Sequence, residues 1–443
     1  MNTFALTDLF KKINSERLLF YCFVGVFLTL PMGTSLPTIC GVMTAVVWCF
    51  SGVAGRLRSS GASSPMQKET RGERRVSICR QAWLRPVFLL IALPWIGLLY
   101  TPDPANMGIQ YAEKTYYWMY CLAIASLPFA PFSASDPETG MPEKFIYAFL
   151  IGLAINALVG TFQFSGILPM VKGRWYSGLE RGYGTLTAYL VLGILITSYY
   201  FKAAKKRTMR FFFFFLMIFY FFHLSILEGR AGYFTVVMLS PLIVYNLFNQ
   251  LNLLKISMAC VLLVGLLCFS PIVRDRIALS IEQISYHLNA NPDSAWGRQY
   301  SDKQDRFYMW YGAARIIKDN PVFGIGTGGY QKVLKAIGKP DDPLIAHPHN
   351  DLLYMTVSFG IMGIVAFFWF FGEILKNAWK ERHTPRGFFV LSAVLVLLTG
   401  GMFNTYLLDV GTIFLLSLVT GLQCGFHQFK KDKNLLLGRN RTD

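Results

Sequence analysis

The residues of this chain best suited to chemistry are arginines and one histidine that lie between long apolar segments. They are Arg174, Arg181, Arg230, Arg306 and His349. A guanidinium donates two parallel hydrogen bonds and stays charged in a partly dry site, so it suits a diphosphate. A histidine can accept a proton near neutral pH. Together these residue types predict a site for a phosphorylated ligand, with a group that handles a proton.

Arg230 has the strongest individual case among the arginines. It lies in the short turn 225–233, which joins two apolar runs and contains Gly229 and Gly232. A charge at the edge of a membrane is costly without a partner. Glu228 is one candidate partner, and an anionic ligand is the other, which we favour.

His349 ends a long polar segment and precedes another apolar run. Pro348 suits the first turn of a helix, which would place His349 at the mouth of that helix. Gly360 and Gly363 then follow on nearly the same side, as a stripe of small residues against which another helix packs closely. We expect His349 to be a general base, with a structural role as the alternative.

The composition indicates that membrane helices hold these residues in place. Of 443 residues, 53% are hydrophobic and only 15% are charged, against roughly a quarter charged in soluble proteins. The chain contains about twelve apolar runs of near-spanning length. They lie near 18–33, 36–54, 86–101, 116–131, 145–165, 183–201, 211–227, 232–248, 255–271, 351–372, 387–406 and 408–426. We therefore predict an all-α, polytopic integral membrane protein with about 12 transmembrane helices.

The basic residues predict how these spans are oriented. The net charge is +17, and Lys and Arg cluster after the second, sixth, tenth and twelfth runs. If both termini are cytoplasmic, all four clusters are cytoplasmic too, as orientation in a membrane favours. The positive charge therefore predicts a topology and contact with membrane lipids, and no nucleic acid partner.

The same topology places the loops 166–182, 228–231 and 272–350 on the outer side. Their cationic residues are not needed for orientation. They are Arg174, Arg181, Arg230, Arg274, Arg276, Arg298 and Arg306, with His347 and His349. A ring of such residues at the outer leaflet predicts a phosphorylated lipid or a polyanion as ligand.

These assignments divide the chain into four parts. Transmembrane helices 1–9 fall in 1–271, a loop subdomain in 272–350, transmembrane helices 10–12 in 351–427, and a basic cytoplasmic tail in 428–443. The first apolar run follows Lys11, Lys12 and Arg17 and lacks a clear cleavage site, so we expect a retained span rather than a signal peptide.

Within the loop subdomain, the spacing predicts an amphipathic helix over 301–318 that lies over the bundle. Its expected apolar face comprises Phe307, Trp310, Tyr311, Ala314 and Ile317. None of the eight cysteines lies in 272–346, so we expect no disulfide framework.

Two motif matches do not predict cofactors. Residues 324–329 satisfy the G-x-G-x-x-G spacing but follow a predicted helix rather than a strand, so we interpret 320–329 as a tight outer loop. His347 and His349 are not accompanied by cysteines or an H-E-x-x-H motif, so a zinc site is not expected. The chain also lacks D-x-D. We expect no metal and no cofactor.

The segment from His349-Asn350 to Gly360 and Gly363 resembles the signature of the O-antigen ligase and O-antigen polymerase superfamily. Residues 305–329 resemble the segment that precedes this signature, and 225–233 resemble the family's outward Arg-containing turn. The matched motifs cover about 225–365. The rest of the chain agrees only in span number and topology.

The resemblance implies a metal-independent, inverting glycosyltransferase of the Gram-negative inner membrane, with its active site facing the periplasm. Its donor would be a glycan on undecaprenyl diphosphate, and its acceptor lipid A–core if the protein is an O-antigen ligase. The arginines would bind the diphosphate, with Arg230 and Arg306 favoured over Arg174 and Arg181, and His349 would act on the acceptor hydroxyl. An O-antigen polymerase or a protein O-oligosaccharyltransferase is the alternative within the superfamily.

A lipid-linked glycan transporter is the alternative outside the superfamily. Transporters usually carry two related halves with broken or charged helices at mid-membrane. This chain shows no internal repeat and concentrates its outward polar residues in one loop. The sequence therefore favours an enzyme.

Overall fold

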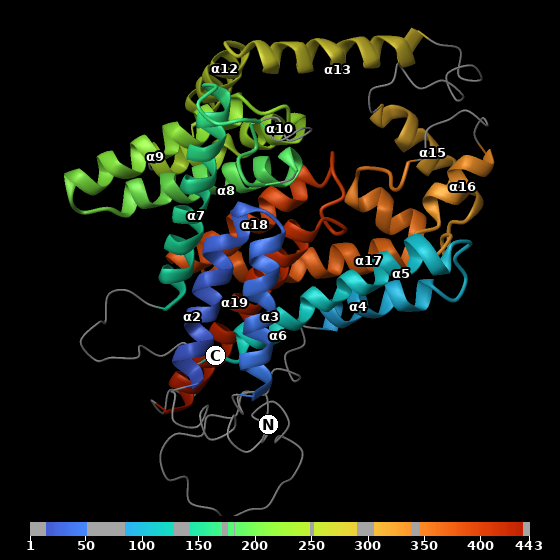
Figure 1. Cartoon of the computed structure of the whole chain (residues 1–443), viewed down its shortest axis with the longest axis horizontal. Coiled ribbons are helices and arrows are strands. Elements are labelled where there is room, and N and C mark those ends of the chain that lie inside the picture. The colour runs from blue at the N-terminus through green and yellow to red at the C-terminus, as the bar shows by residue number, and fades with distance from the viewer. Residues whose placement is uncertain are drawn as a thin grey trace, which may run out of the picture.

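The computed structural model describes residues 15–50, 85–127, 141–170, 176–180, 182–248, 252–289, 305–337 and 345–436. Within these ranges every regular element is a helix and none is a strand (Figure 1). The predicted all-α fold class is confirmed for this part of the chain.

The helices of the first half include those of the first six apolar runs and short helices between the third and fourth runs. They are α2 (Ser15–Thr29), η1 (Leu30–Met32), α3 (Ser35–Phe50), α4 (Arg85–Gly97), η6 (Pro104–Gly108), α5 (Ile109–Glu113), η7 (Lys114–Tyr117), α6 (Trp118–Ala125), α7 (Met141–Phe164) and α8 (Tyr183–Ala203).

The second half contains the remaining runs and the helices of the large loop. They are α9 (Arg207–Ser225), α10 (Arg230–Met238), α11 (Ser240–Phe248), α12 (Leu253–Cys268), α13 (Pro271–Asn289), α15 (Arg306–Asp319), α16 (Tyr330–Ile337), α17 (Asp351–Lys380), α18 (Pro385–Gly400) and α19 (Val410–Leu436). Because α19 continues to Leu436, it includes the first part of the predicted tail 428–443.

Four described helices, α7, α8, α9 and α17, are long and apolar enough to cross a membrane. Two bent pairs raise this number to six if each pair is one span: α10 with α11, bent by 45°, and α12 with α13, bent by 104°. Further apolar helices, such as α3 and α18, are shorter. The chain is thus a polytopic membrane protein, while the count of twelve spans stays a prediction.

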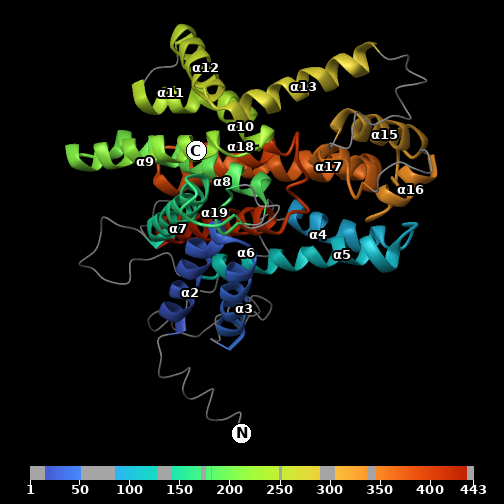
Figure 2. The ribbon, with the colours of Figure 1, turned by 45° about the horizontal axis from the view of Figure 1, so that its top comes forward.

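The core of the bundle lies around α8, α18 and α19, whose side chains are mostly buried. α8 packs against α9 and α18, and α19 packs against α6 and α18. Large apolar side chains fill this core, among them Tyr189, Phe389 and Phe414. Outside this core, α13 extends away from α12 toward α15 in both views of the ribbon (Figures 1 and 2).

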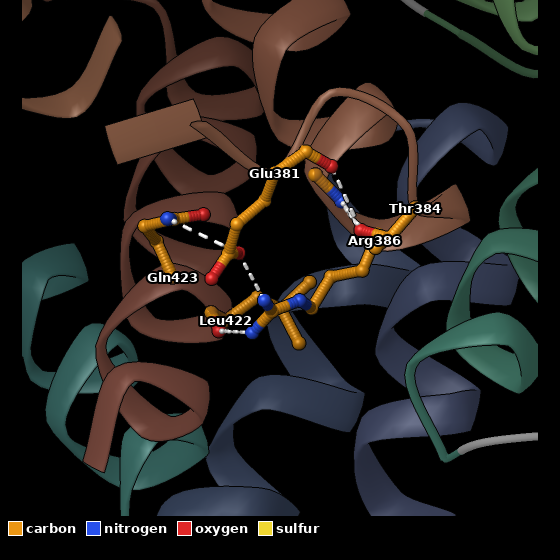
Figure 3. A network of polar contacts seen from close by, with 6 residues as sticks. Glu381, Thr384, Arg386, Leu422 and Gln423 are labelled. Carbon is orange, nitrogen blue, oxygen red and sulfur yellow. Dashed lines mark hydrogen bonds and ion pairs between the residues drawn. The ribbon is translucent and has the colours of Figure 1, made fainter. Parts of the chain in front are cut away.

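A buried ion pair fixes the turn between α17 and α18 (Figure 3). Arg386 pairs with Glu381, and its Nη1 donates to the carbonyl of Leu422 on α19 at 3.2 Å. Gln423 Nε2 lies 3.5 Å from the same Glu381 carboxylate. Each buried charge thus has a partner, as a low-dielectric interior requires. The network joins three helices at the far end of α17 from His349.

The long helix α17 is broken at Gly360, whose φ is +58°. The break frees the carbonyls of Val357 and Ser358, which accept hydrogen bonds from the backbone N–H groups of Ile325 and Gly326, each at 2.9 Å. The glycine-rich loop therefore supplies the donors that the interrupted helix lacks.

Close approach explains the glycines of that loop. Gly324, Gly326 and Gly328 all have positive φ. A Cβ at Gly326 would lie 2.5 Å from the carbonyl oxygen of Gly97 in α4. The G-x-G spacing thus serves backbone packing between α17 and α4, in agreement with our interpretation of 320–329 as a tight loop.

The predicted stripe of small residues below His349 is wrong. A Cβ at Gly360 would lie 2.3 Å from the carbonyl oxygen of Val322, and one at Gly363 would lie 2.1 Å from that of Met355. Both glycines therefore accommodate the bend of α17 and the loop docked on it. The prediction assumed a straight helix, in which residues eight positions apart lie about 12 Å apart.

The predicted amphipathic helix is confirmed over Arg306–Asp319, but its apolar face was assigned wrongly. The buried side is formed by Tyr308, Met309, Gly312, Ala313 and Ile316. It packs against α17. Tyr311 and Ala314, placed on the apolar face, are exposed, while Phe307 and Trp310 are half-buried. The prediction left out Gly312 and Ala313, whose small size suits the side that packs against α17.

Candidate active site

Three arginines from three different helices line one cavity of about 150 Å³. Arg230 is the first residue of α10, Arg276 lies in α13, and Arg306 is the first residue of α15. Tyr183 and Asn404 also line this cavity. Two of the three loops predicted to face outward, 228–231 and 272–350, therefore meet at a single cationic site.

The side chain of Arg230 is held by α13. Its Nη1 donates to Ser280 Oγ at 3.0 Å and to Gln283 Oε1 at 2.9 Å. Glu228, considered as the partner of Arg230, forms an ion pair with Arg276. This carboxylate offsets one of the three positive charges, and the cavity keeps a net positive charge that suits an anion.

Asp305 positions Arg306 at the start of α15. Its carboxylate caps the helix by accepting from the N–H groups of Phe307 at 3.1 Å and Tyr308 at 3.4 Å. The other carboxylate oxygen lies 2.6 Å from His287 Nε2, at the end of α13. Because a helix cap fixes the direction of the first turn, Asp305 directs Arg306 toward the cavity.

Arg306 carries donors that the protein satisfies only in part. Its Nη2 lies 3.5 Å from Asn404 Oδ1, while its buried Nε has no hydrogen-bond partner among the described residues. Burial, and then the charge of Arg230, lower the pKa of Arg306 to about 10. Arg306 is still charged at neutral pH, and a bound anion would satisfy its donors and relieve the repulsion.

His349 lies just before α17, not within its first turn. Asn350 is the N-cap of α17 and accepts from the N–H of Leu353 at 2.9 Å, so Pro348 precedes the helix. The prediction for Pro348 is therefore wrong, because the Asn350 cap defines the helix start. His349 adopts a φ of +49°, one of two positive values for non-glycine residues in the described chain. Such strain is often found at functional sites.

The electrostatic surroundings of His349 link it to the arginines. Burial, and then the charge of Arg306, lower the pKa of His349 to about 4. The imidazole is therefore neutral at pH 7 and can accept a hydrogen bond or a proton. His349 does not line the cationic cavity, and the charge of Arg306 is what links the two.

His347 lies beside His349. The two imidazole ring centroids are 4.3 Å apart, and His347 Nδ1 lies 3.0 Å from Thr405 Oγ1. Burial, then His349 and Lys114, lower the pKa of His347 to about 3. His347 is neutral as well, and its bond to Thr405 fixes the ring beside His349.

The segment 401–409 is part of the site, and sequence reasoning missed it. Asn350 Nδ2 donates to the Met402 carbonyl at 3.0 Å, and Asp351 accepts from the N–H of Leu407 at 2.9 Å. The predicted runs 387–406 and 408–426 counted eight of its nine residues as membrane spans, whereas α18 ends at Gly400 and α19 begins at Val410. The pair Asn404-Thr405 between apolar residues was the signal that could have revealed it.

Of the remaining candidates, Arg174 and Arg181 lie outside the described residues. Arg276 was recognised as an outward cation but not singled out. Gly229 and Gly232 allow the turn to pack closely on α8, because a Cβ at either would lie within 2.5 Å of Thr187. Within the described ranges, no three His, Cys, Asp or Glu side chains gather as metal ligands would.

These features define a polytopic membrane protein with a buried cationic site next to a neutral histidine. A family model of the O-antigen ligase matches residues 215–368, which contain Arg230, Arg276, Arg306 and His349. This range agrees with the motifs predicted over 225–365, and the resemblance to the O-antigen ligase family is confirmed.

A protein of Rickettsia conorii that bears the name of a polysaccharide ligase is 29% identical over 79 residues. The match covers 16% of this chain and 19% of that protein. The similarity to this relative therefore concerns one segment and not the whole length of either protein.

Proposed function

We propose that this protein is an O-antigen ligase, a metal-independent inverting glycosyltransferase. It transfers a glycan from undecaprenyl diphosphate to lipid A–core at the periplasmic face of a Gram-negative inner membrane. The observation that carries the proposal is the convergence of Arg230, Arg276 and Arg306 on one cavity electrostatically linked to His349. The match to the O-antigen ligase family supports it.

In this mechanism the arginines bind the diphosphate and stabilise its departure. The acceptor hydroxyl oxygen attacks the anomeric carbon, and the bond from that carbon to the diphosphate oxygen breaks. The diphosphate takes the electron pair and gains negative charge. Preorganised cations that face developing charge in a buried site lower the barrier. Arg306, whose buried Nε has no hydrogen-bond partner among the described residues, is well suited to this task.

His349 handles the proton of the acceptor hydroxyl. The neutral imidazole accepts this proton as the oxygen attacks, or holds the hydroxyl in line by a hydrogen bond. With a pKa near 4 in the free protein, His349 is a weak base. Bound diphosphate would offset the charge of Arg306 and make the imidazole more basic.

The proposal is tested by transfer with purified protein, undecaprenyl-diphosphate glycan and defined lipid A–core in excess EDTA. We expect a glycan-bearing lipid A–core band on a gel. A longer lipid-linked glycan without such a band would indicate a polymerase. Loss of activity in EDTA that Mg²⁺ or Mn²⁺ restores would contradict metal independence. Vesicle uptake of donor without any product would indicate a transporter.

A further inference from the structure

Four aromatic side chains form a continuous surface beside the cationic cavity. They come from α10, α15 and the segment 401–409 and are Phe234, Phe307, Trp310 and Phe403, called here the aromatic ledge. Ring centroids lie 4.7 Å apart for Phe234 and Phe403, 5.9 Å for Trp310 and Phe403, and 5.6 Å for Phe307 and Trp310. All four side chains are half-buried, so part of each is accessible.

The ledge is continuous with the site that the arginines form. The Arg306 guanidinium lies 5.9 Å from the ring centroid of Phe403, and Phe403 precedes Asn404, which lines the cavity. Phe307 likewise follows Arg306 in α15. A ligand whose diphosphate occupies the cavity would therefore place its next chemical group over the ledge.

Trp310 indicates which chemical group of the ligand would lie over the aromatic ledge. Its Nε1 is buried and has no hydrogen-bond partner within the described chain. A buried N–H donor without an acceptor is costly, and tryptophan usually finds a partner for it. A sugar offers hydroxyl acceptors together with an apolar C–H face that packs on aromatic rings. An isoprenoid chain offers no acceptor.

We propose that the aromatic ledge binds the sugar attached to the donor diphosphate, with Trp310 Nε1 donating to a sugar hydroxyl and the ring packing on the sugar face. This inference rests on the proposed function and adds a glycan subsite to it. α15 and the segment 401–409 lie outside the helices long enough to span a membrane. A polar glycan is thus the part of the donor that these elements would meet.

The test compares the binding of two ligands to the full-length protein: bare undecaprenyl diphosphate and undecaprenyl-diphosphate glycan. Trp310→Ala should weaken binding of the glycan-bearing donor about tenfold or more, as loss of one aromatic contact and one hydrogen bond implies. Binding of bare undecaprenyl diphosphate should change less than about twofold. Trp310→Phe, which keeps a ring but removes the N–H, should fall in between.

Trp369→Ala is the matched control, because Trp369 lies in the membrane-spanning part of α17 and is 41% exposed. It should leave both affinities unchanged. If Trp310→Ala does not fold, Trp310→Phe alone decides, with a selective loss of glycan binding of about threefold. Equally weakened binding of both ligands, or unchanged binding of both, would overturn the proposal that the aromatic ledge binds the sugar. If the wild-type protein bound neither ligand, the proposed function itself would fail.

Discussion

The imidazole of His349 and the guanidinium of Arg306 are electrostatically coupled across the candidate site. Burial and this positive charge lower the pKa of His349 to about 4. An anion that neutralises Arg306 would therefore make His349 more basic. Donor binding is therefore expected to prepare the histidine for its role.

This coupling predicts a specific pH dependence. Transfer needs neutral His349, so the rate should fall as the pH drops below the pKa of His349. The midpoint of the acid limb should lie near pH 4 for kcat/KM, which reports the free protein. For kcat it should lie at a higher pH, because bound diphosphate raises this pKa. Rates measured between pH 3.5 and about 8 with varied donor concentration give both profiles.

The residual rate of His349→Ala serves as the control for this pH experiment. The variant lacks the titrating imidazole but retains the ionisation of the donor. A wild-type acid limb that persists unchanged in His349→Ala would show that the donor, and not His349, titrates.

Substitution of Arg230 tests the binding of diphosphate. Arg230→Ala should lower kcat/KM about 10²-fold, because it removes charge-assisted hydrogen bonds from a partly buried site. Arg230→Lys should restore only part of the loss, since an ammonium lacks the planar fork. Arg207→Ala, at the exposed start of α9, should behave like the wild type. If Arg230→Ala kept near-normal transfer at a normal protein level, Arg230 would have only a structural role, through its contact with α13.

Substitution of Gly360 tests whether the break in α17 is needed for the stability of the protein. Gly360→Ala should destabilise the protein by more than about 2 kcal/mol, because φ is positive and a Cβ would meet the Val322 carbonyl. Gly372→Ala is the control, since nothing lies within 4 Å of a Cβ there. Thermal unfolding in detergent should show a lower midpoint for Gly360→Ala only. Equal midpoints would mean that α17 can straighten.

The helical class could be predicted because it follows from hydrophobicity and charge, which are local properties of the sequence. The apolar runs gave helices, and the outward cations Arg230 and Arg306 do meet in one cavity. The roles of Arg276 and Asn404 depend on tertiary contacts between distant segments, which no local pattern contains. The break at Gly360 was hidden for the same reason. Its compensating hydrogen bonds come from Ile325 and Gly326, in a loop that precedes the helix.

The orientation in the membrane can be tested with single cysteines in a cysteine-free variant. Met402→Cys, at an exposed position in the segment 401–409, should react with an impermeant thiol reagent in intact spheroplasts. Lys380→Cys, at the exposed far end of α17, should react only after the membrane is opened. The reverse pattern of labelling would overturn the proposed topology and place the candidate site in the cytoplasm.

The most direct test of the central claim compares donor binding and glycan transfer in His349→Ala. Removal of a general base typically costs about 10²–10⁴ in rate, so transfer should be almost lost, while the arginines still bind undecaprenyl-diphosphate glycan with wild-type affinity. His347→Ala, which loses only the support of the ring through Thr405, should retain much more activity. Intact binding without product is the predicted result. Equal loss of transfer in both variants, or loss of donor binding in His349→Ala, would contradict a chemical role for His349.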